Sequence, residues 1–249
     1  VEGDTDFRLI RRFARKLGMV ELSAGTDLTA IASGGFSSWE RIRALASGFE
    51  TALGTALHVG AIFDRDYWCD EQLTEMQGEL IAHLEFAHIH ERKEIENYLL
   101  APVVLQRALD SAVEDRNRRT GQAPGTNTSI ASILEDATQP FKEHAQAQYI
   151  AKRLEYYGRG SKDASTITAK AINLFESKWK HLDTRVEIVP GKDVLRAVRE
   201  RVANIFSVNL TDHRIVSAFD RAEVPEDLRR MIESLDAYRT GDHKVVNGN

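Results

Sequence analysis

The chain of 249 residues is 42% hydrophobic and 29% charged, a composition typical of a soluble globular protein. Its net charge of −5 argues against a simple basic nucleic-acid coat protein. A nuclease is still compatible with this charge, because acidic metal ligands add negative charge. No stretch approaches the roughly 18 uninterrupted apolar residues of a membrane span. Cys69 is the only cysteine, which excludes an internal disulfide. Together these features predict a cytoplasmic protein with no membrane partner.

The first helix is predicted close to the start of the chain. Its apolar face recurs at helical spacing in Phe7, Ile10, Phe13 and Leu17. Asp4 or Thr5 can cap this helix, and Gly18 can end it. Because a helix of this kind normally follows a strand, we expect an apolar strand upstream of Val1, with Glu2 at its carboxyl end.

Strands and helices then alternate in the predicted order of elements. Short apolar runs predict strands over residues 28–32, 59–63 and 86–90, and apolar residues at helical spacing predict helices over 39–53 and 73–84. With the strand expected upstream, the order β-α-β-α-β-α-β predicts a parallel sheet with right-handed crossovers. This part of the chain therefore belongs to the α/β class.

Two pairs of carboxylates follow predicted strands. Asp64 and Asp66 come directly after one strand, and Glu94 and Glu96 follow the next. Ligands of open α/β sheets bind outside the carboxyl ends of strands, and residues two apart in extended chain face the same side. Crowding of these carboxylates with Glu2 would raise their pKa values, and divalent cations relieve that cost. We therefore expect a site for one or two metal ions with oxygen ligands.

Simpler interpretations of the same residues stay open. Asp64 and Asp66 could cap the following helix, and the charged run over residues 91–96 could be a solvent-exposed helix start. His88 and His90 are interpreted as strand or rim residues rather than as metal ligands.

The second half of the chain is predicted to be mainly helical. Pro102 suits the first turn of a helix, and the polar stretch 116–129 is the best internal boundary. Further helices are expected near residues 130–155, 165–180, 192–206, 211–220 and 226–236. Residues 187–192 are expected to form a short extended piece that ends in a turn. The chain is thereby divided into a catalytic core, 1–115, and a helical portion, 130–239.

Three motifs together resemble a known family. They are Val1-Glu2-Gly3 followed by Asp6, the triplet Asp64-Arg65-Asp66, and the run Glu94-Ile95-Glu96-Asn97-Tyr98-Leu99-Leu100. All three are similar to the motifs of a Toprim domain. The last run narrows the resemblance to the carboxyl-terminal nuclease domain of OLD-family ATP-dependent endonucleases, including Gabija-type and retron-associated relatives in phage defence.

Two later motifs extend this resemblance. Pro190-Gly191-Lys192 resembles the lysine segment of that group, and Val224-Pro225-Glu226-Asp227-Leu228 resembles its closing helix. The resemblance covers residues 1–105 and 185–236, whereas residues 110–185 match nothing.

The resemblance implies a Toprim-type, Rossmann-like parallel sheet flanked by helices, with a truncated first strand and a mainly helical carboxyl-terminal portion that supplies Lys192. It also implies cleavage of DNA phosphodiester bonds with two Mg²⁺ or Mn²⁺ ions. The implied metal ligands are Glu2, Asp6, Asp64, Asp66, Glu94 and Glu96. The implied catalytic residues are Glu2, Asp64, Asp66 and Lys192. Glu2 would carry a proton, and Lys192 would stabilise charge on the scissile phosphate.

The family pairs this nuclease with an ATPase domain. No Gly-x-x-x-x-Gly-Lys-Ser/Thr motif occurs here, and Gly191-Lys192-Asp193 lacks both the leading glycine and the hydroxyl residue. Either the ATPase lies upstream in a longer chain or in an associated one, or this is a stand-alone Toprim nuclease. The truncated first strand favours an ATPase upstream. The other implied partners are DNA and a second copy of the chain in a homo-oligomer.

Basic and aromatic residues that could contact DNA cluster after the internal boundary. The candidates are Lys152, Arg153, Tyr156, Tyr157, Arg159 and Lys162. Such a mixture can follow a phosphate backbone and stack on bases. A solvated helix end explains the same pattern.

Two other functions fit part of the sequence. In a HAD-like phosphotransferase, Asp64 would accept the phosphoryl group and Asp66 would act as acid and base. That function leaves Glu2, Glu94 and Glu96 without a role. A non-catalytic Toprim module for dimerisation or DNA docking would have no need for so many crowded carboxylates.

Overall fold

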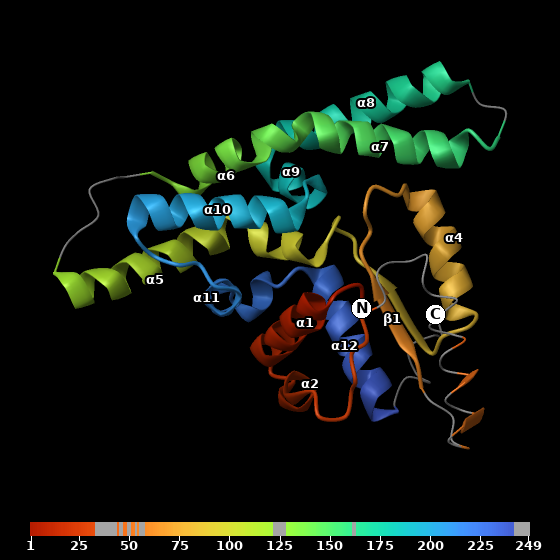
Figure 1. Cartoon of the computed structure of the whole chain (residues 1–249), viewed down its shortest axis with the longest axis horizontal. Helices are drawn as coiled ribbons and strands as arrows, with labels where there is room; N and C mark the ends of the chain where they lie inside the picture. Colours follow the sequence, from red (N-terminus) through yellow and green to blue (C-terminus); the bar gives the residue numbers. More distant parts are fainter. Residues whose placement is uncertain are drawn as a thin grey trace. The chain divides into compact units, whose positions relative to one another are not determined.

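The computed structural model describes residues 1–32, 44, 47–48, 51–52, 54, 58–121, 128–160 and 163–241 (Figure 1). The described part is mostly helical and contains one parallel pair of strands. The strands are β1 (Gly60–Phe63) and β2 (Phe86–Ile89). The helices are α1 (Asp4–Leu17), α2 (Val20–Ala24), α4 (Asp70–Ile81), α5 (Pro102–Thr120), α6 (Ile130–Thr138), α7 (Lys142–Tyr157), α8 (Ala164–Lys180), α9 (Leu182–Ile188), α10 (Gly191–Phe206), α11 (Asp212–Ala218) and α12 (Glu226–Thr240). Short 3₁₀ helices are η2 (Ile95–Leu100), η3 (Gln139–Phe141) and η4 (Arg221–Glu223).

The chain forms two compact units. Unit 1 comprises Val1–Arg65, Leu73–Glu91 and Arg221–Asn249, and unit 2 comprises Asp66–Gln72 and Arg92–Asp220. The catalytic core predicted over residues 1–115 therefore contributes segments to both units. Within the described residues, no helix has the length and apolar character needed to cross a membrane.

Unit 1 is built on the parallel strand pair. The register runs from Gly60 opposite Phe86 to Phe63 opposite Ile89, and the His90 N–H extends it by donating to the Phe63 carbonyl at 3.0 Å. Parallel strands require a crossover connection, and the helix between them provides it. Apolar side chains of that helix and its end pack against the strands in a core of Ala61, Phe63, Leu80 and Leu84. The dense apolar run that predicted β1 is therefore a buried strand.

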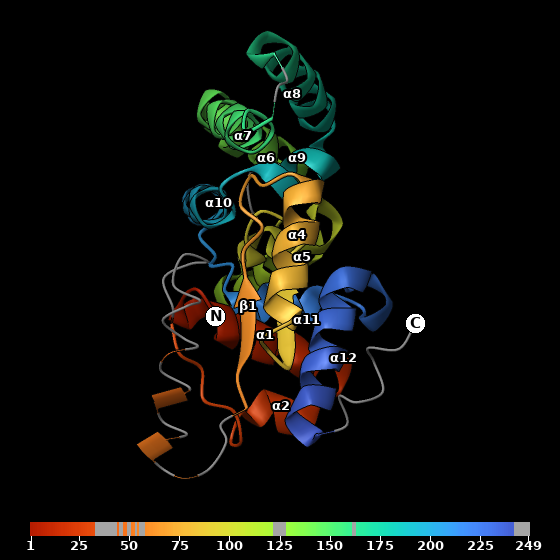
Figure 2. The same cartoon turned by 90° about the vertical axis from the view of Figure 1, so that its right-hand side faces the viewer.

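Helix α1 packs against α2 and α12 in the same unit (Figure 2). Its buried stripe is Leu9, Ile10, Phe13 and Ala14. The helix ends at Gly18, which adopts the left-handed conformation that glycine tolerates without strain. Its start differs from the prediction, because the N-cap residue is Gly3 rather than Asp4 or Thr5. The Asp6 carboxylate closes this end by accepting the Gly3 N–H at 2.8 Å.

The rest of the predicted sheet differs from the structure. Residues 28–32 carry no regular secondary structure, so the strand predicted there is wrong. Ile31 is 60% exposed, so no layer of the described residues covers its side chain. The helix predicted over 39–53 lies largely outside the described residues. What the described residues establish is a helical protein with parallel strands, which is compatible with the α/β class.

Unit 2 is a set of packed helices. Figure 1 shows α7 and α8 side by side, and their interface buries Tyr149, Phe175 and Trp179. The Phe175 ring lies 5.6 Å from the Tyr149 ring and 5.3 Å from the Trp179 ring, between centroids. The helices predicted near residues 165–180, 192–206 and 211–220 are confirmed as α8, α10 and α11 of this unit. The helix predicted near 226–236 is confirmed as α12, which belongs to unit 1.

Two predicted boundaries in this region are wrong. The helix expected over 130–155 is divided into α6 and α7 by η3, which contains Pro140, a residue that cannot continue the backbone hydrogen-bond ladder. The extended piece expected over 187–192 is shorter, because Glu187 and Ile188 belong to α9. Buried Arg185 holds α9 in place by donating to the Trp179 carbonyl at 2.8 Å and to Glu135. Only Val189 and Pro190 remain to link α9 to α10.

The contact between η2 and α10 brings two distant motifs together. Asn97 in η2 is fully buried, and its amide donates to the carbonyls of Val186 at 2.7 Å and Val189 at 2.9 Å. Its side-chain oxygen accepts the Glu94 N–H at 2.8 Å. Gly191, the first residue of α10, lies directly against this amide. A Cβ atom on Gly191 would come within 2.6 Å of the Asn97 Oδ1 atom.

Replacing Gly191 by alanine should therefore destabilise the protein. The free energy of unfolding of Gly191→Ala should fall by about 2 kcal/mol, since neither the buried amide nor the Asn97 backbone can move away. Gly78→Ala is the matched control, because Gly78 is an exposed residue of α4 and no atom lies within 4 Å of a Cβ built on it. That change should raise the free energy of unfolding by about 0.5–1 kcal/mol through helix propensity. Urea denaturation measures both, and equal effects of the two changes would contradict this packing.

Candidate functional site

Unit 1 brings three of the predicted acidic residues into one neighbourhood. Asp64 directly follows β1, and its N–H donates to the Glu2 carboxylate at 3.3 Å across 62 positions of the chain. Asp6 lies in the first turn of α1 and closes the turn that begins at Gly3. The Glu2 carboxylate thus contacts the Asp64 backbone, and Asp6 closes the turn that directly follows Glu2.

Unit 2 brings Asp66 and Glu94 together around a lysine. The Lys93 ammonium lies 3.5 Å from the Asp66 carboxylate and forms an ion pair and hydrogen bond with Glu94. The backbone fixes this arrangement, because the Asp66 N–H donates to the Lys93 carbonyl at 3.0 Å and the Lys93 N–H donates to the Glu187 carbonyl at 2.9 Å. Asp66 itself adopts a positive φ of 50°, a conformation that aspartate tolerates better than most residues.

Glu94 also joins the predicted lysine segment. The Lys192 N–H donates to the second Glu94 oxygen at 2.9 Å, across 98 positions of the chain. The carboxylate thus lies at the N-terminus of α10, where the helix dipole favours negative charge. The Lys192 side chain is exposed, so the contact that anchors this residue uses its backbone alone. Glu96 lies in the first turn of η2 and is half-buried.

Tyr67 completes this part of unit 2. Its side chain is only 7% exposed, and the Lys93 ammonium lies 5.2 Å from the centre of its ring. Burial raises the pKa of the Tyr67 hydroxyl, and the charges of Glu94 and Asp66 raise it further. Among the described residues, this buried hydroxyl has no hydrogen-bond partner.

The predicted metal ligands divide between the two units. Glu2, Asp6 and Asp64 belong to unit 1, whereas Asp66, Glu94 and Glu96 belong to unit 2. No group of three or more His, Cys, Asp or Glu side chains that could hold a metal ion is present in the described ranges. The donor chemistry nevertheless fits Mg²⁺ or Mn²⁺, because all six residues offer carboxylate oxygens. The lysine between Asp66 and Glu94 further shows that this pair accommodates a positive charge.

The predicted DNA-contact residues are placed less favourably. Arg153 is only 7% exposed, and its guanidinium donates to the carbonyls of Tyr67 at 3.2 Å and Tyr149 at 3.1 Å. It is therefore a buried structural residue and not a surface contact for DNA, which corrects the prediction. Lys152 and Arg159 both pair with Glu155, at 3.1 Å and 3.6 Å, as expected for a solvated helix end.

Three predicted DNA-contact residues remain, namely Tyr156, Tyr157 and Lys162. The Tyr157 hydroxyl donates to Glu71 at 2.6 Å. Burial raises the pKa of Tyr157, and the hydrogen bond to Glu71 raises it further. The Tyr156 ring lies 5.0 Å from the Tyr157 ring, between centroids. Lys162 lies outside the described residues.

Sequence reasoning missed Lys93 and Tyr67. Both are neighbours of predicted ligands in the chain, since Tyr67 follows Asp66 and Lys93 precedes Glu94. The available signal was the charged run over residues 91–94, in which a lysine interrupts the acids after a strand. Nothing in that run distinguishes a solvated lysine from one folded back between two carboxylates.

His88 of β2 and His90, which directly follows this strand, both belong to unit 1. The rings of His88 and His90 meet edge to face with centroids 5.2 Å apart, and His90 is buried. Burial lowers the pKa of His88 to about 4, with Arg230 acting in the same direction and Asp227 against it. Burial lowers the pKa of His90 as well, and His88 reinforces that shift.

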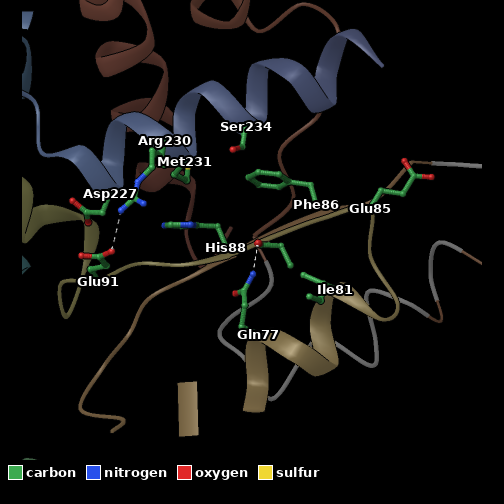
Figure 3. Close-up of a pocket in the computed structure, with 11 residues that line it drawn as sticks. Gln77, Ile81, Glu85, Phe86, His88, Glu91, Asp227, Arg230, Met231 and Ser234 are labelled. Carbon is green, nitrogen blue, oxygen red and sulfur yellow. Dashed lines mark hydrogen bonds and ion pairs between the residues drawn. The ribbon is translucent and has the colours of Figure 1, made fainter. Parts of the chain in front are cut away.

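His88 lines a pocket of about 360 Å³. His88 extends from β2 toward Arg230 of α12, and Phe86, Met231 and Ser234 also line this space (Figure 3). No metal-ligand group of three includes either histidine in the described residues.

The low pKa of His88 predicts acid sensitivity of unit 1. In the unfolded chain this group has its usual pKa near 6.5, so the unfolded chain gains a proton as the pH falls from about 6.5 to 4 while the folded chain does not. The free energy of unfolding should therefore drop by about 2–3 kcal/mol between pH 7 and pH 4.5 from this residue. His88→Gln should lose that part of the pH dependence, whereas His83→Gln, on an exposed residue, should retain it. Urea titrations at both pH values measure the difference, and identical pH profiles for wild type and His88→Gln would refute it.

Comparisons with known proteins identify no relative of this chain. No protein-family model matches it, no curated protein matches it, and no solved structure matches it.

Proposed function

We propose that this chain is a metal-dependent DNA endonuclease or nickase of the Toprim type, resembling the nuclease part of OLD-family enzymes. The contact between Glu94 and the Lys192 backbone carries this proposal, because it joins two motifs that were assigned to one catalytic centre from sequence alone. The hydrogen bond from Asp64 to Glu2 supports it in the same way for unit 1. Gly191 and Asn97 give a physical reason for the glycine of the later motif, since a Cβ atom at position 191 would clash with the Asn97 amide.

The proposed roles follow the chemistry of each side chain. Glu2, Asp6, Asp64, Asp66, Glu94 and Glu96 would hold Mg²⁺ or Mn²⁺. The metal would supply an activated water and stabilise the leaving oxygen of the phosphodiester. Glu2 would also carry a proton, and the exposed Lys192 ammonium would face the charge that develops on the scissile phosphate.

A DNA substrate also requires a positive surface, and unit 2 contains one outside the predicted cluster. Arg118 and Arg214 bind the two oxygens of Asp115, at 2.8 Å and 2.9 Å, and Arg119 donates to the Asp115 carbonyl at 3.1 Å. These four residues line a shallow groove of about 440 Å³. Three guanidinium groups against one carboxylate leave a net positive charge, which suits a phosphate backbone. This cluster supports DNA binding better than the helix end at residues 152–162.

The nuclease proposal includes the wider setting that the resemblance implies. An ATPase domain, in the same or an associated chain, would control access to the cleavage centre in a cytoplasmic phage-defence or DNA-processing protein that works as a homo-oligomer. The HAD-like alternative gives no role to the contact between Glu94 and Lys192. A non-catalytic docking module gives no role to the lysine held between Asp66 and Glu94.

Metal-dependent nicking tests the proposed function directly. Supercoiled plasmid should be nicked or linearised with Mg²⁺ or Mn²⁺ and left intact in EDTA, because the carboxylates bind no phosphate without a bridging cation. Asp64→Ala should abolish cleavage and leave the fold intact. Asp110→Ala is the control, since this exposed aspartate on α5 lies among no predicted ligands. Full activity in EDTA, or normal cleavage by Asp64→Ala, would refute the metal mechanism.

Lys192 offers a test of the ammonium alone, because its contact with Glu94 uses the backbone N–H. Lys192→Ala should slow cleavage about 100-fold, the effect of removing one group that stabilises developing charge, and should leave Mn²⁺ affinity unchanged or slightly higher. Lys192→Arg should restore only part of the rate, since a planar guanidinium replaces a compact charge. Lys180→Ala, on the exposed end of α8, is the control. Single-turnover cleavage rates decide the question, and an unchanged rate for Lys192→Ala would remove this residue from the mechanism.

A further inference from the structure

The Lys93 ammonium lies where two proposed metal ligands of unit 2 meet. It is 3.5 Å from the Asp66 carboxylate and bonded to Glu94. We propose that Lys93 is an internal counter-ion that competes with a divalent cation for these two carboxylates, and that metal binding displaces its ammonium. This inference rests on the proposed function, because it takes Asp66 and Glu94 as metal ligands.

The position of Lys93 is fixed by the backbone and by burial. Its N–H and carbonyl are both hydrogen-bonded within unit 2, to the Glu187 carbonyl and from the Asp66 N–H. The residue is only 9% exposed, so its charge has little access to water. A buried ammonium costs free energy unless it is paired or hydrogen-bonded, and Lys93 is paired with Glu94, whose side chain is 17% exposed, and with Asp66, whose side chain is 49% exposed. Lys93 and the two acids therefore stabilise one another in the absence of metal.

Tyr67 supplies an independent observation that points to a second arrangement. Its side chain is more than nine-tenths buried beneath the Lys93 ammonium, and its hydroxyl has no hydrogen-bond partner in the described part of the chain. An unused O–H donor at this depth costs free energy. The charges of Glu94 and Asp66 both act on this hydroxyl, so it lies in the field of the same two carboxylates that Lys93 neutralises.

A metal ion and the ammonium cannot share this place. Two cations a few ångströms apart repel each other, and the burial of Lys93 reduces the screening of its charge by water. When a divalent cation binds Asp66 and Glu94, the Lys93 ammonium must therefore move away from these carboxylates. The affinity of unit 2 for metal is then set by how firmly Lys93 is held as well as by the ligands.

The experiment measures Mn²⁺ binding to the whole chain by isothermal titration calorimetry, with no DNA present. Lys93→Met keeps the length of the side chain and removes its charge. Its Mn²⁺ affinity should rise on the order of tenfold or more, which is the effect that one neighbouring charge has on the affinity of a carboxylate for a proton. Its melting temperature without metal should fall, and the gain in melting temperature on adding Mn²⁺ should exceed that of wild type. Lys142→Met, which removes a lysine paired with Glu176 at 2.9 Å, should leave Mn²⁺ affinity unchanged.

Unchanged or weaker Mn²⁺ affinity in Lys93→Met would overturn the proposal and leave Lys93 as a structural residue. If that variant does not fold, Lys93→Gln gives the same measurement, since the amide is neutral and can still donate to Glu94. The nicking assay separates the two proposals. A wild-type chain that cleaves DNA while Lys93→Met binds Mn²⁺ no better refutes the counter-ion alone. A chain that does not cleave DNA, but binds Mn²⁺ more tightly without Lys93, refutes the nuclease and retains the counter-ion.

Discussion

The buried amide of Asn97 is the interaction on which the organisation of unit 2 depends. It accepts one backbone N–H, from Glu94, and donates to two backbone carbonyls at the end of α9 and just beyond it. Among the residues of this size, only an amide offers an acceptor and two donors together. Aspartate would lack the donors, and leucine would leave three buried backbone groups unsatisfied, each at a cost of about 1–3 kcal/mol. Because the same amide contacts Gly191, the start of α10 and the Glu94 carboxylate are positioned by one side chain.

The second constraint is the balance of charge around Glu94. Its two oxygens have different partners, the Lys93 ammonium and the first turn of α10. One oxygen is thus held by a group that can move, and the other by backbone that cannot. This arrangement keeps the carboxylate oriented even if the lysine leaves. A ligand that is already oriented loses less conformational entropy when it binds a cation, which favours the role proposed for Glu94.

How far the sequence predicts this structure depends on how local the relevant signal is. The β1 strand, α1, α8, α10, α11 and α12 follow from apolar spacing within one element and were predicted, whereas α9 and the division of α6 from α7 were not. The pairing of Glu2 with Asp64 and of Glu94 with Lys192 was anticipated because those residues belong to motifs that resemble one family. The prediction of a strand at 28–32 is wrong, because the sequence of these residues does not reveal whether another layer packs on them. Lys93 and Arg153 could not be distinguished from surface residues, since burial of a cation depends on carbonyls and carboxylates far away in the chain.

Arg153 and Lys93 show why a buried cation must be interpreted through its partners. Arg153 binds backbone carbonyls and stacks over the Tyr149 ring, with its guanidinium carbon 3.3 Å from the ring centre. Those acceptors are neutral carbonyls, one in a turn and one in α7, so a cation in solution gains little by replacing the guanidinium. Lys93 is paired with two carboxylates, which also attract a divalent cation. A similar degree of burial is therefore compatible with a fixed structural contact for Arg153 and, under the counter-ion proposal, with an exchangeable contact for Lys93.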